Sequence, residues 1–262
     1  MENADAFAVK MAASGLRHFR LLEHHRSLHS TNDEAQQRLG DQTAAGLVIV
    51  ADEQSGGKGR RGRAWIAPPG SGLLFTAILP QPIDAGSSWA VTFWAGLRVA
   101  DALARWNISP ALQWPNDILL DGRKLCGILC VSRIIADRAA IGCGIGVNVH
   151  RPRDRSAFDG IQPPPIFLDD VRVVGDHARQ ELLAEILRAF ELHLDELRNP
   201  ASVVREWELR AGVPGTRYRF MLENGNEIEG EALRLNTGGG LVMQTQGGER
   251  VVELAERVQV VR

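Results

Sequence analysis

Lysine is scarce in this chain of 262 residues, because only three of its 30 basic side chains are lysines and the other 27 are arginines. Cysteine is scarce too: three cysteines without the spacing of a disulfide framework are typical of a reducing compartment. The chain has no run of about 18 apolar residues and no amino-terminal signal sequence, which predicts a cytoplasmic protein without a membrane span. Its net charge of -2 lacks the basic excess of proteins that mainly bind nucleic-acid backbones.

Apolar segments of two kinds, strand-like runs and helix-spaced patterns, alternate along the first 212 residues. A capping box from Thr31 to Glu34 predicts a helix that ends at Gly40. Buried strands are predicted at 46–54 and 72–80, a strand–hairpin–strand unit at 111–135, and two short strands around glycines at 138–150. Further helices are predicted at 87–107, 177–199 and 201–212. The proline-rich stretch 151–165 is predicted to be a surface loop.

The composition changes after Pro214. Apolar and polar residues alternate there and are broken at short intervals by Asn-Gly, Gly-Gly-Gly and Gly-Gly turns, which is typical of a small all-β barrel. We therefore predict an α+β protein with three parts: a flexible N-terminus at 1–14, a catalytic domain at 15–212 and an all-β domain at 213–262.

The segment GGKGRRGRAW, residues 56–65, combines four glycines with four cationic side chains. Glycines let successive backbone N–H groups approach an anion, and arginine forks bind phosphate oxygens. A solvated basic loop or an RNA-binding arginine-glycine segment is the alternative from this window alone. Its position between two buried strands favours the phosphate cradle, although no GxxxxGK[ST] loop is present.

Two of the three lysines, Lys58 and Lys124, lie in glycine-flanked turns. A site that needs one compact ammonium beside a reacting oxygen resists replacement by the planar arginine fork. Trp114, Asn116 and Asp117 precede Lys124 across a predicted Asp-Gly hairpin, so an acid and an ammonium can face one cleft. A capped turn with a surface lysine is the alternative.

Other chemistry finds no support in the sequence. His25 and His29 have helical spacing but no HExxH or Cys/His zinc pattern accompanies them. Cys126 and Cys130 fall on one face of a strand and are interpreted as small buried residues. The chain has no GxSxG elbow, and GCGIGV lacks the GxGxxG spacing of a dinucleotide site.

Four segments occur together in the order and approximate spacing of biotin protein ligases, and from about residue 17 the chain resembles that family. They are Ser30-Thr31-Asn32, QSGGKGRRGRAW, WPNDILLDGRKLCGIL and GIGVN. The resemblance implies a mixed β-sheet with flanking helices, of the class II aminoacyl-tRNA synthetase/biotin ligase type. The C-terminal module resembles the family's small SH3-like β-barrel.

The resemblance also implies a two-step acyl transfer. Biotin and Mg-ATP give biotinyl-5′-AMP and pyrophosphate, and the biotinyl group then passes to a lysine of a biotin carboxyl carrier domain. The first step brings a carboxylate to an anionic α-phosphate, which needs fixed cations in a site shielded from water. Lys124 and Arg60 are the implied catalytic residues, ATP and Mg2+ the implied cofactors, and the glycine loop the implied lid over the adenylate.

The site residues carried over from the family form three sets. The biotin-binding residues are Ser30, Thr31, Asn32, Gln54, Gly57, Lys58, Gly59, Arg60, Lys124, Gly127, Leu129 and Gly144. The nucleotide-binding residues are Arg60, Arg63, Trp65, Asn116, Asp117, Lys124 and Asn148. Asp117 is also the implied Mg2+ ligand.

The chain departs from the family pattern at several positions. Gln113 replaces the usual lysine before Trp-Pro-Asn-Asp, Lys58 stands where arginine is common, Ser132 replaces a frequent acid, and LAERV replaces the usual GEV turn. Two alternatives therefore stay open: a lipoate or octanoyl ligase of related fold, and a biotin- or nucleotide-binding regulator without catalysis. Fewer than 30 residues precede Ser30, too few for the family's winged helix-turn-helix, so we expect no DNA binding; the sequence leaves a homodimer open.

Overall fold

A computed structural model describes residue 7 and residues 15–221, 226–253 and 257–261. The predicted flexible segment 1–14 lies outside these residues except for Phe7, which is buried against the His24 ring at a centroid distance of 5.0 Å. None of the helices in the described part of the chain is long and apolar enough to cross a membrane.

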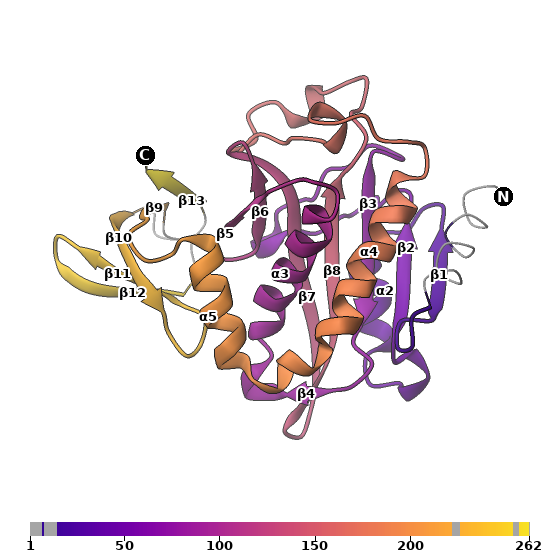
Figure 1. Ribbon diagram of the computed structural model, residues 1–262, viewed down its shortest axis with the longest axis horizontal. Helices are drawn as coiled ribbons and strands as arrows, with labels where there is room; N and C mark the ends of the chain where they lie inside the picture. The colour runs from indigo at the N-terminus through magenta and orange to yellow at the C-terminus, as the bar shows by residue number, and fades with distance from the viewer. Residues whose placement is uncertain (1–6, 8–14, 222–225, 254–256, 262) are drawn as a thin grey trace.

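The main body is a mixed sheet flanked by helices, as predicted (Figure 1). The strand order is β1-β2-β3-β8-β7-β6-β5, with β4 paired to β8, and among these described strands β1 and β2 form the one parallel pair. The strands are β1 Leu21–His25, β2 Leu47–Ala51, β3 Gly72–Ile78, β4 Ile83–Asp84, β5 Ala111–Gln113, β6 Asp117–Leu120, β7 Arg123–Ile135 and β8 Arg138–Asn148. The apolar runs predicted as strands at 46–54 and 72–80 are confirmed, because β2 and β3 are buried along their whole length.

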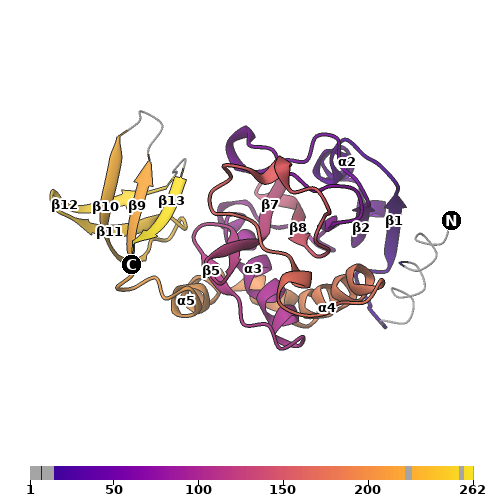
Figure 2. The same cartoon turned by 90° about the horizontal axis from the view of Figure 1, so that it is seen from above.

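Helices cover both faces of this sheet. Figure 2 shows α3, Ala90–Ala104, and α4, Ala178–His193, on one side of the strands and α2, Thr31–Arg38, on the other. The helix α5, Pro200–Ala211, follows α4 and ends at Gly212, whose φ of 59° is left-handed. Each of the predicted helices is therefore present, with the end of the third one, Leu194–Arg198, wound as a 3-10 helix.

Two local predictions are wrong. The α2 helix begins with Ser30 as its N-cap, where the Ser30 side chain accepts a bond from the Asn32 N–H, so Thr31 is already inside the helix. In the segment 138–150, predicted to hold two short strands, β8 forms one long strand at Arg138–Asn148. Gly142, Gly144 and Gly146 do not break β8, because residues two apart share one face of a strand, where they leave room for neighbouring side chains.

The segment after Gly212 forms a second, antiparallel sheet in the order β12-β11-β10-β9-β13. Its strands are β9 Arg217–Met221, β10 Glu227–Leu235, β11 Leu241–Thr245, β12 Gly248–Val252 and β13 Arg257–Val261. Among the described residues β12 and β13 are the two edges, so the predicted closed barrel is corrected to an open sheet. The division of the chain at residue 212 stays a prediction.

The C-terminal sheet packs on the body through Trp114 and the turn before β11. The Trp114 Nε1–H donates to the Gly239 carbonyl at 3.0 Å, and its ring meets Phe220 edge to face at 5.7 Å. Gly239 has a φ of 81°, and a Cβ there would lie 2.8 Å from Trp89. This contact places the second sheet directly behind the Trp-Pro-Asn-Asp turn.

Candidate active site

The glycine-rich loop between β2 and β3 is folded into a compact hairpin. Trp65 N–H donates to Gly57 O at 2.9 Å and Gly59 N–H donates to Arg63 O at 2.7 Å, across a 3-10 turn at Arg60–Gly62. A Cβ at Gly57 would lie 2.6 Å from the Trp65 carbonyl, so only glycine fits there. The loop is therefore a compact turn held by its own backbone hydrogen bonds and not an extended tag, and the phosphate cradle stays a prediction.

Trp65 ends this loop and lies on a floor made by two glycines. Gly127 of β7 and Gly146 of β8 are directly paired, and a Cβ on either would lie 2.8 or 2.5 Å from the indole. The Trp65 Nε1–H is buried without a hydrogen-bond partner among the described contacts. The indole thus links the glycine loop to the two central strands, and a ligand that reaches this floor has to displace or stack on it.

Lys124 faces the same floor because β7 contains a β-bulge. Lys124 pairs with Leu119 while Cys126 pairs with the adjacent Ile118, so β7 has one extra residue between them. In a regular strand Lys124 and Gly127, three apart, would face opposite sides of the sheet, and the extra residue brings them to one side. The Lys124 Nζ lies 3.4 Å from the position of a Gly127 Cβ and 5.5 Å from the centroid of the Trp65 ring.

Two cations surround the Asp117 carboxylate. The Lys124 Nζ lies 2.8 Å from Asp117 Oδ1, and both side chains are mostly buried. Burial lowers the pKa of the Arg60 guanidinium from its ordinary value, and the Asp117 charge acts in the opposite direction. Arg60 stays protonated because its ordinary pKa is above about 12. The group therefore carries one net positive charge beside the glycine floor.

Amide side chains hold the backbone on both sides of Lys124. Asn148 Nδ2 donates to the Lys124 carbonyl at 3.0 Å, and Asn116 Nδ2 donates to the Ile128 carbonyl at 2.8 Å. Lys124 N–H donates to Pro164 O at 2.8 Å, so the predicted surface loop 151–165 returns to the site. Asn116 and Asn148, predicted on the nucleotide side, thus fix the position of the lysine.

A second polar cluster lies where α2 begins. Thr31 N–H donates to Gln54 Oε1 at 2.6 Å, and Asn32 Nδ2 donates to Leu129 O at 2.9 Å. A Cβ at Gly144 would lie 2.2 Å from Asn32 Oδ1, so the amide rests flat on that glycine. Ser30, Thr31 and Asn32 are all buried. The structure therefore brings the polar residues predicted for biotin into one cluster along β7 from Lys124.

Sequence reasoning missed Thr76, which joins this cluster from β3. Its hydroxyl is fully buried and lies 2.9 Å from Thr31 Oγ1 and 2.8 Å from Asn32 Oδ1. A single hydroxyl inside the otherwise apolar run GLLFTAIL was the signal that could have identified it.

Two predicted cations stand apart from the Asp117 group. Lys58 Nζ pairs with Asp33 Oδ1 at 2.5 Å at the half-exposed start of α2, and sequence reasoning missed this partner. Arg63 is exposed and its Nε contacts the Arg60 carbonyl at 3.5 Å. Gln113, which replaces the usual lysine, is buried in β5 and pairs with Asp117 in the β5–β6 ladder.

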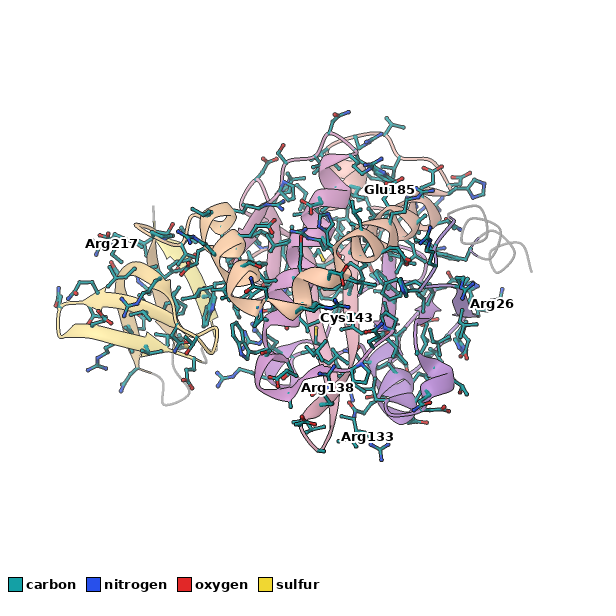
Figure 3. All side chains as sticks on the ribbon, turned by 60° about the horizontal axis from the view of Figure 1, so that its bottom comes forward. Arg26, Arg133, Arg138, Cys143, Glu185 and Arg217 are labelled. Carbon is teal, nitrogen blue, oxygen red and sulfur yellow. The ribbon has the colours of Figure 1, made fainter. Side chains whose placement is uncertain are left out.

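The described residues hold few candidates for metal or thiol chemistry near Lys124. No group of three or more His, Cys, Asp or Glu side chains that could hold a metal was found there, so Asp117 offers one carboxylate. Burial raises the pKa of the Cys126 thiol, in keeping with its interpretation as a buried residue. Figure 3 shows Cys143 within the body, whereas Arg133 and Arg138 lie towards the turn end of the β7–β8 hairpin.

The chain is similar to known ligases in sequence. Residues 25–148 match the Biotin/lipoate A/B protein ligase family. The chain is 30% identical over 237 residues to a biotin–[acetyl-CoA-carboxylase] ligase of Paracoccus denitrificans, covering 87% of this chain and 95% of that protein. It is 29% identical over 239 residues to the bifunctional ligase/repressor BirA of Bacillus spizizenii, covering 87% and 71%.

Solved structures show the same fold. A biotin protein ligase from Aquifex aeolicus in complex with biotin and ATP superposes with a TM-score of 0.72 at 23% identity, covering 93% of this chain and 100% of that one. The mixed sheet with flanking helices is thus shared along nearly the whole length.

Proposed function

Since this chain belongs to the biotin/lipoate A/B protein ligase family and is a biotin ligase, we propose that it activates biotin with ATP and biotinylates a carrier domain. A biotin carboxylate oxygen attacks the α-phosphorus of ATP, and pyrophosphate leaves. The ε-amine of an acceptor lysine on a biotin carboxyl carrier domain then attacks the biotinyl carbonyl, and AMP leaves. The observation that carries this proposal is the pair of cations, Lys124 and Arg60, beside a glycine floor.

The cations lower the barrier of the first step. Two anions about 4 Å apart repel by about 4 kcal/mol at an effective dielectric constant near 20. The Lys124 ammonium, fixed at the floor by the bulge, is placed to bind the incoming carboxylate and the α-phosphate oxygen together. Arg60, on the loop that faces it, neutralises phosphate charge and is the second positive group of the site.

Asp117 has two roles in this proposal. It holds the Lys124 ammonium at the floor through the 2.8 Å ion pair. Its carboxylate also fits Mg2+, which prefers oxygen ligands and is usually held by one or two carboxylates and substrate phosphates. Mg2+ bound with the nucleotide as part of the substrate would be held by Asp117 and would neutralise phosphate charge.

The remaining residues bind the two ends of the acyl adenylate. The cluster of Ser30, Thr31 and Gln54 supplies polar partners for the ureido ring, and the acyl chain lies against the Trp65 indole that covers the Gly127–Gly146 floor. Trp65 supplies an aromatic face to the adenylate, and the loop that carries it keeps water away from the mixed anhydride.

The test is incubation with biotin, Mg-ATP and an acceptor carrier domain, followed by pyrophosphate release and the mass of the acceptor. We expect both pyrophosphate and a biotinyl mass increase. Release of pyrophosphate without labelling of the acceptor would contradict the proposed carrier domain as acceptor. Binding of biotin without release of pyrophosphate would identify a regulator. A preference for lipoate in the same assay would identify a lipoate ligase. Absence of DNA binding and the oligomeric state stay predictions.

A further inference from the structure

Four polar groups form a chain of hydrogen bonds behind Thr31. Thr76 Oγ1 lies 2.9 Å from Thr31 Oγ1 and 2.8 Å from Asn32 Oδ1, and Asn32 Nδ2 lies 2.9 Å from the Leu129 carbonyl oxygen. Thr76 is fully buried, and Thr31 and Asn32 are 4% and 5% exposed. Solvent therefore does not compete for these hydrogen bonds, and every hydroxyl and amide proton needs an acceptor within the protein.

The Leu129 carbonyl, at the end of this series of hydrogen bonds, determines which atom donates in each of them. The Leu129 carbonyl can only accept, so the Asn32 atom facing it is the NH2 group, and the opposite atom is the amide oxygen, which can also only accept. The single proton of the Thr76 hydroxyl is then donated to Asn32 Oδ1. The contact between Thr76 and Thr31 leaves one arrangement: the Thr31 hydroxyl donates its proton to Thr76 Oγ1.

The Thr31 hydroxyl therefore has a fixed polarity on the side that faces a ligand. With its proton committed to Thr76, Thr31 Oγ1 presents a lone pair. We propose that Thr76 and Asn32 are positioning residues that make Thr31 an obligatory hydrogen-bond acceptor, so that the pocket selects a ring N–H over an oxygen of the same shape. This inference rests on the proposed function, in which Thr31 binds the biotin ureido ring.

The neighbouring groups have fixed polarity as well, and it complements that of Thr31. Gln54 turns its Oε1 to the Thr31 N–H, so its NH2 is the end left to donate. The Ser30 Oγ accepts from the Asn32 N–H at 3.2 Å and keeps its own hydroxyl proton. The cluster thus offers one acceptor beside two donors, which matches one N–H and the C=O of a cyclic urea.

The first experiment needs only the unmodified protein. Binding of biotin is compared by calorimetry, without ATP, with binding of cyclic carbamate analogues in which one or the other ring N–H is replaced by oxygen. We expect one carbamate to bind about 100-fold more weakly than biotin, because a lone pair would face a lone pair in a buried site. Equal affinity of biotin and both carbamates overturns the inference; failure of biotin itself to bind contradicts the proposed function instead.

The second experiment moves the specificity. Thr76→Val keeps the shape of the side chain but removes the acceptor of the Thr31 proton, which can then turn to the ligand. We expect biotin to bind about tenfold more weakly and its preference over the disfavoured carbamate to fall from about 100-fold to about tenfold or less. In Thr76→Ser, the matched control that keeps the hydroxyl, the preference is retained.

A merely structural role for Thr76 predicts a different pattern. Loose packing would weaken biotin and carbamate alike and would leave their ratio unchanged, which overturns the inference. The KM for ATP should stay within about twofold in Thr76→Val, because Lys124, Arg60 and Asp117 lie at the other end of the site. If Thr76→Val fails to fold, the carbamate comparison in the unmodified protein still decides.

Discussion

Removal of the Lys124 ammonium is the most direct perturbation of the proposed chemistry. Its Nζ lies 2.8 Å from Asp117 Oδ1, at the glycine floor, so Lys124→Ala deletes one of two cations and leaves the Asp117 carboxylate facing the reacting anions. Loss of one preorganised charge-stabilising group costs about 2.7–4 kcal/mol of transition-state stabilisation. We therefore expect adenylation to slow by about 10²- to 10³-fold.

The assay is single-turnover formation of biotinyl-5′-AMP at saturating biotin and Mg-ATP. Arg123→Ala is the matched control, because Arg123 begins the same strand and carries a positive charge but belongs to none of the predicted site sets. It should retain the rate of the unmodified protein within about twofold. A normal adenylation rate in Lys124→Ala, with folding confirmed by circular dichroism, would refute the assignment of Lys124.

Three further predictions test other parts of the structure. Gly146→Val should push the indole of Trp65 from the floor, since a Cβ would lie 2.5 Å from it. We expect leakage of biotinyl-5′-AMP to rise at least about tenfold. Unchanged retention of the adenylate in a filter-binding assay would contradict this prediction. Arg98→Ala should lower the free energy of unfolding by about 3–5 kcal/mol in urea titrations, because Arg98 is 2% exposed and pairs with Glu206 at 2.5 Å. A loss of less than about 1 kcal/mol would argue against a stabilising role of this ion pair. Burial raises the pKa of Tyr218, the one tyrosine of the chain, to about 12. The folded protein then holds this proton more tightly than the unfolded chain, so its contribution is complete below about pH 10 and is lost as the pH rises towards 12; Tyr218→Phe should remove this part of the pH dependence of unfolding, and an unchanged profile would contradict it.

The elements of the fold were predictable where one local signal dominates. Strands β2 and β3 are continuous apolar runs, and the Asp121-Gly122 turn has positive φ at both residues, 51° and 71°, as an Asp-Gly hairpin predicts. The glycines of β8 led to the wrong prediction of two short strands, because a glycine can indicate either a turn or the close approach of a neighbouring side chain. Only the packing of Asn32 and Trp65 against them decides between the two.

The sequence pointed to residues that the structure brings together, but not to their geometry, and their roles stay predictions. The pairing of Lys124 with Asp117 follows from their places on two strands of one hairpin. The bulge that turns Lys124 towards Gly127 depends on which residues of β6 face β7, and no local pattern specifies that register. Thr76 was missed for a related reason: a strand far along the chain supplies it, and its partners are set by the sheet order.

The strand β7 connects the two halves of the site and sets the distance between them. Lys124 bends its ammonium to Gly127, and Leu129, whose carbonyl fixes Asn32, is two residues further along. Two residues of a strand span about 7 Å. In the proposed function, the cation meets the biotin carboxylate and the cluster meets the ring, so the two are separated by a length suited to one short acyl chain. Because one rigid strand fixes both ends, we expect binding of the ring to position the carboxylate for attack, so that binding energy at a remote group lowers the barrier of the chemical step.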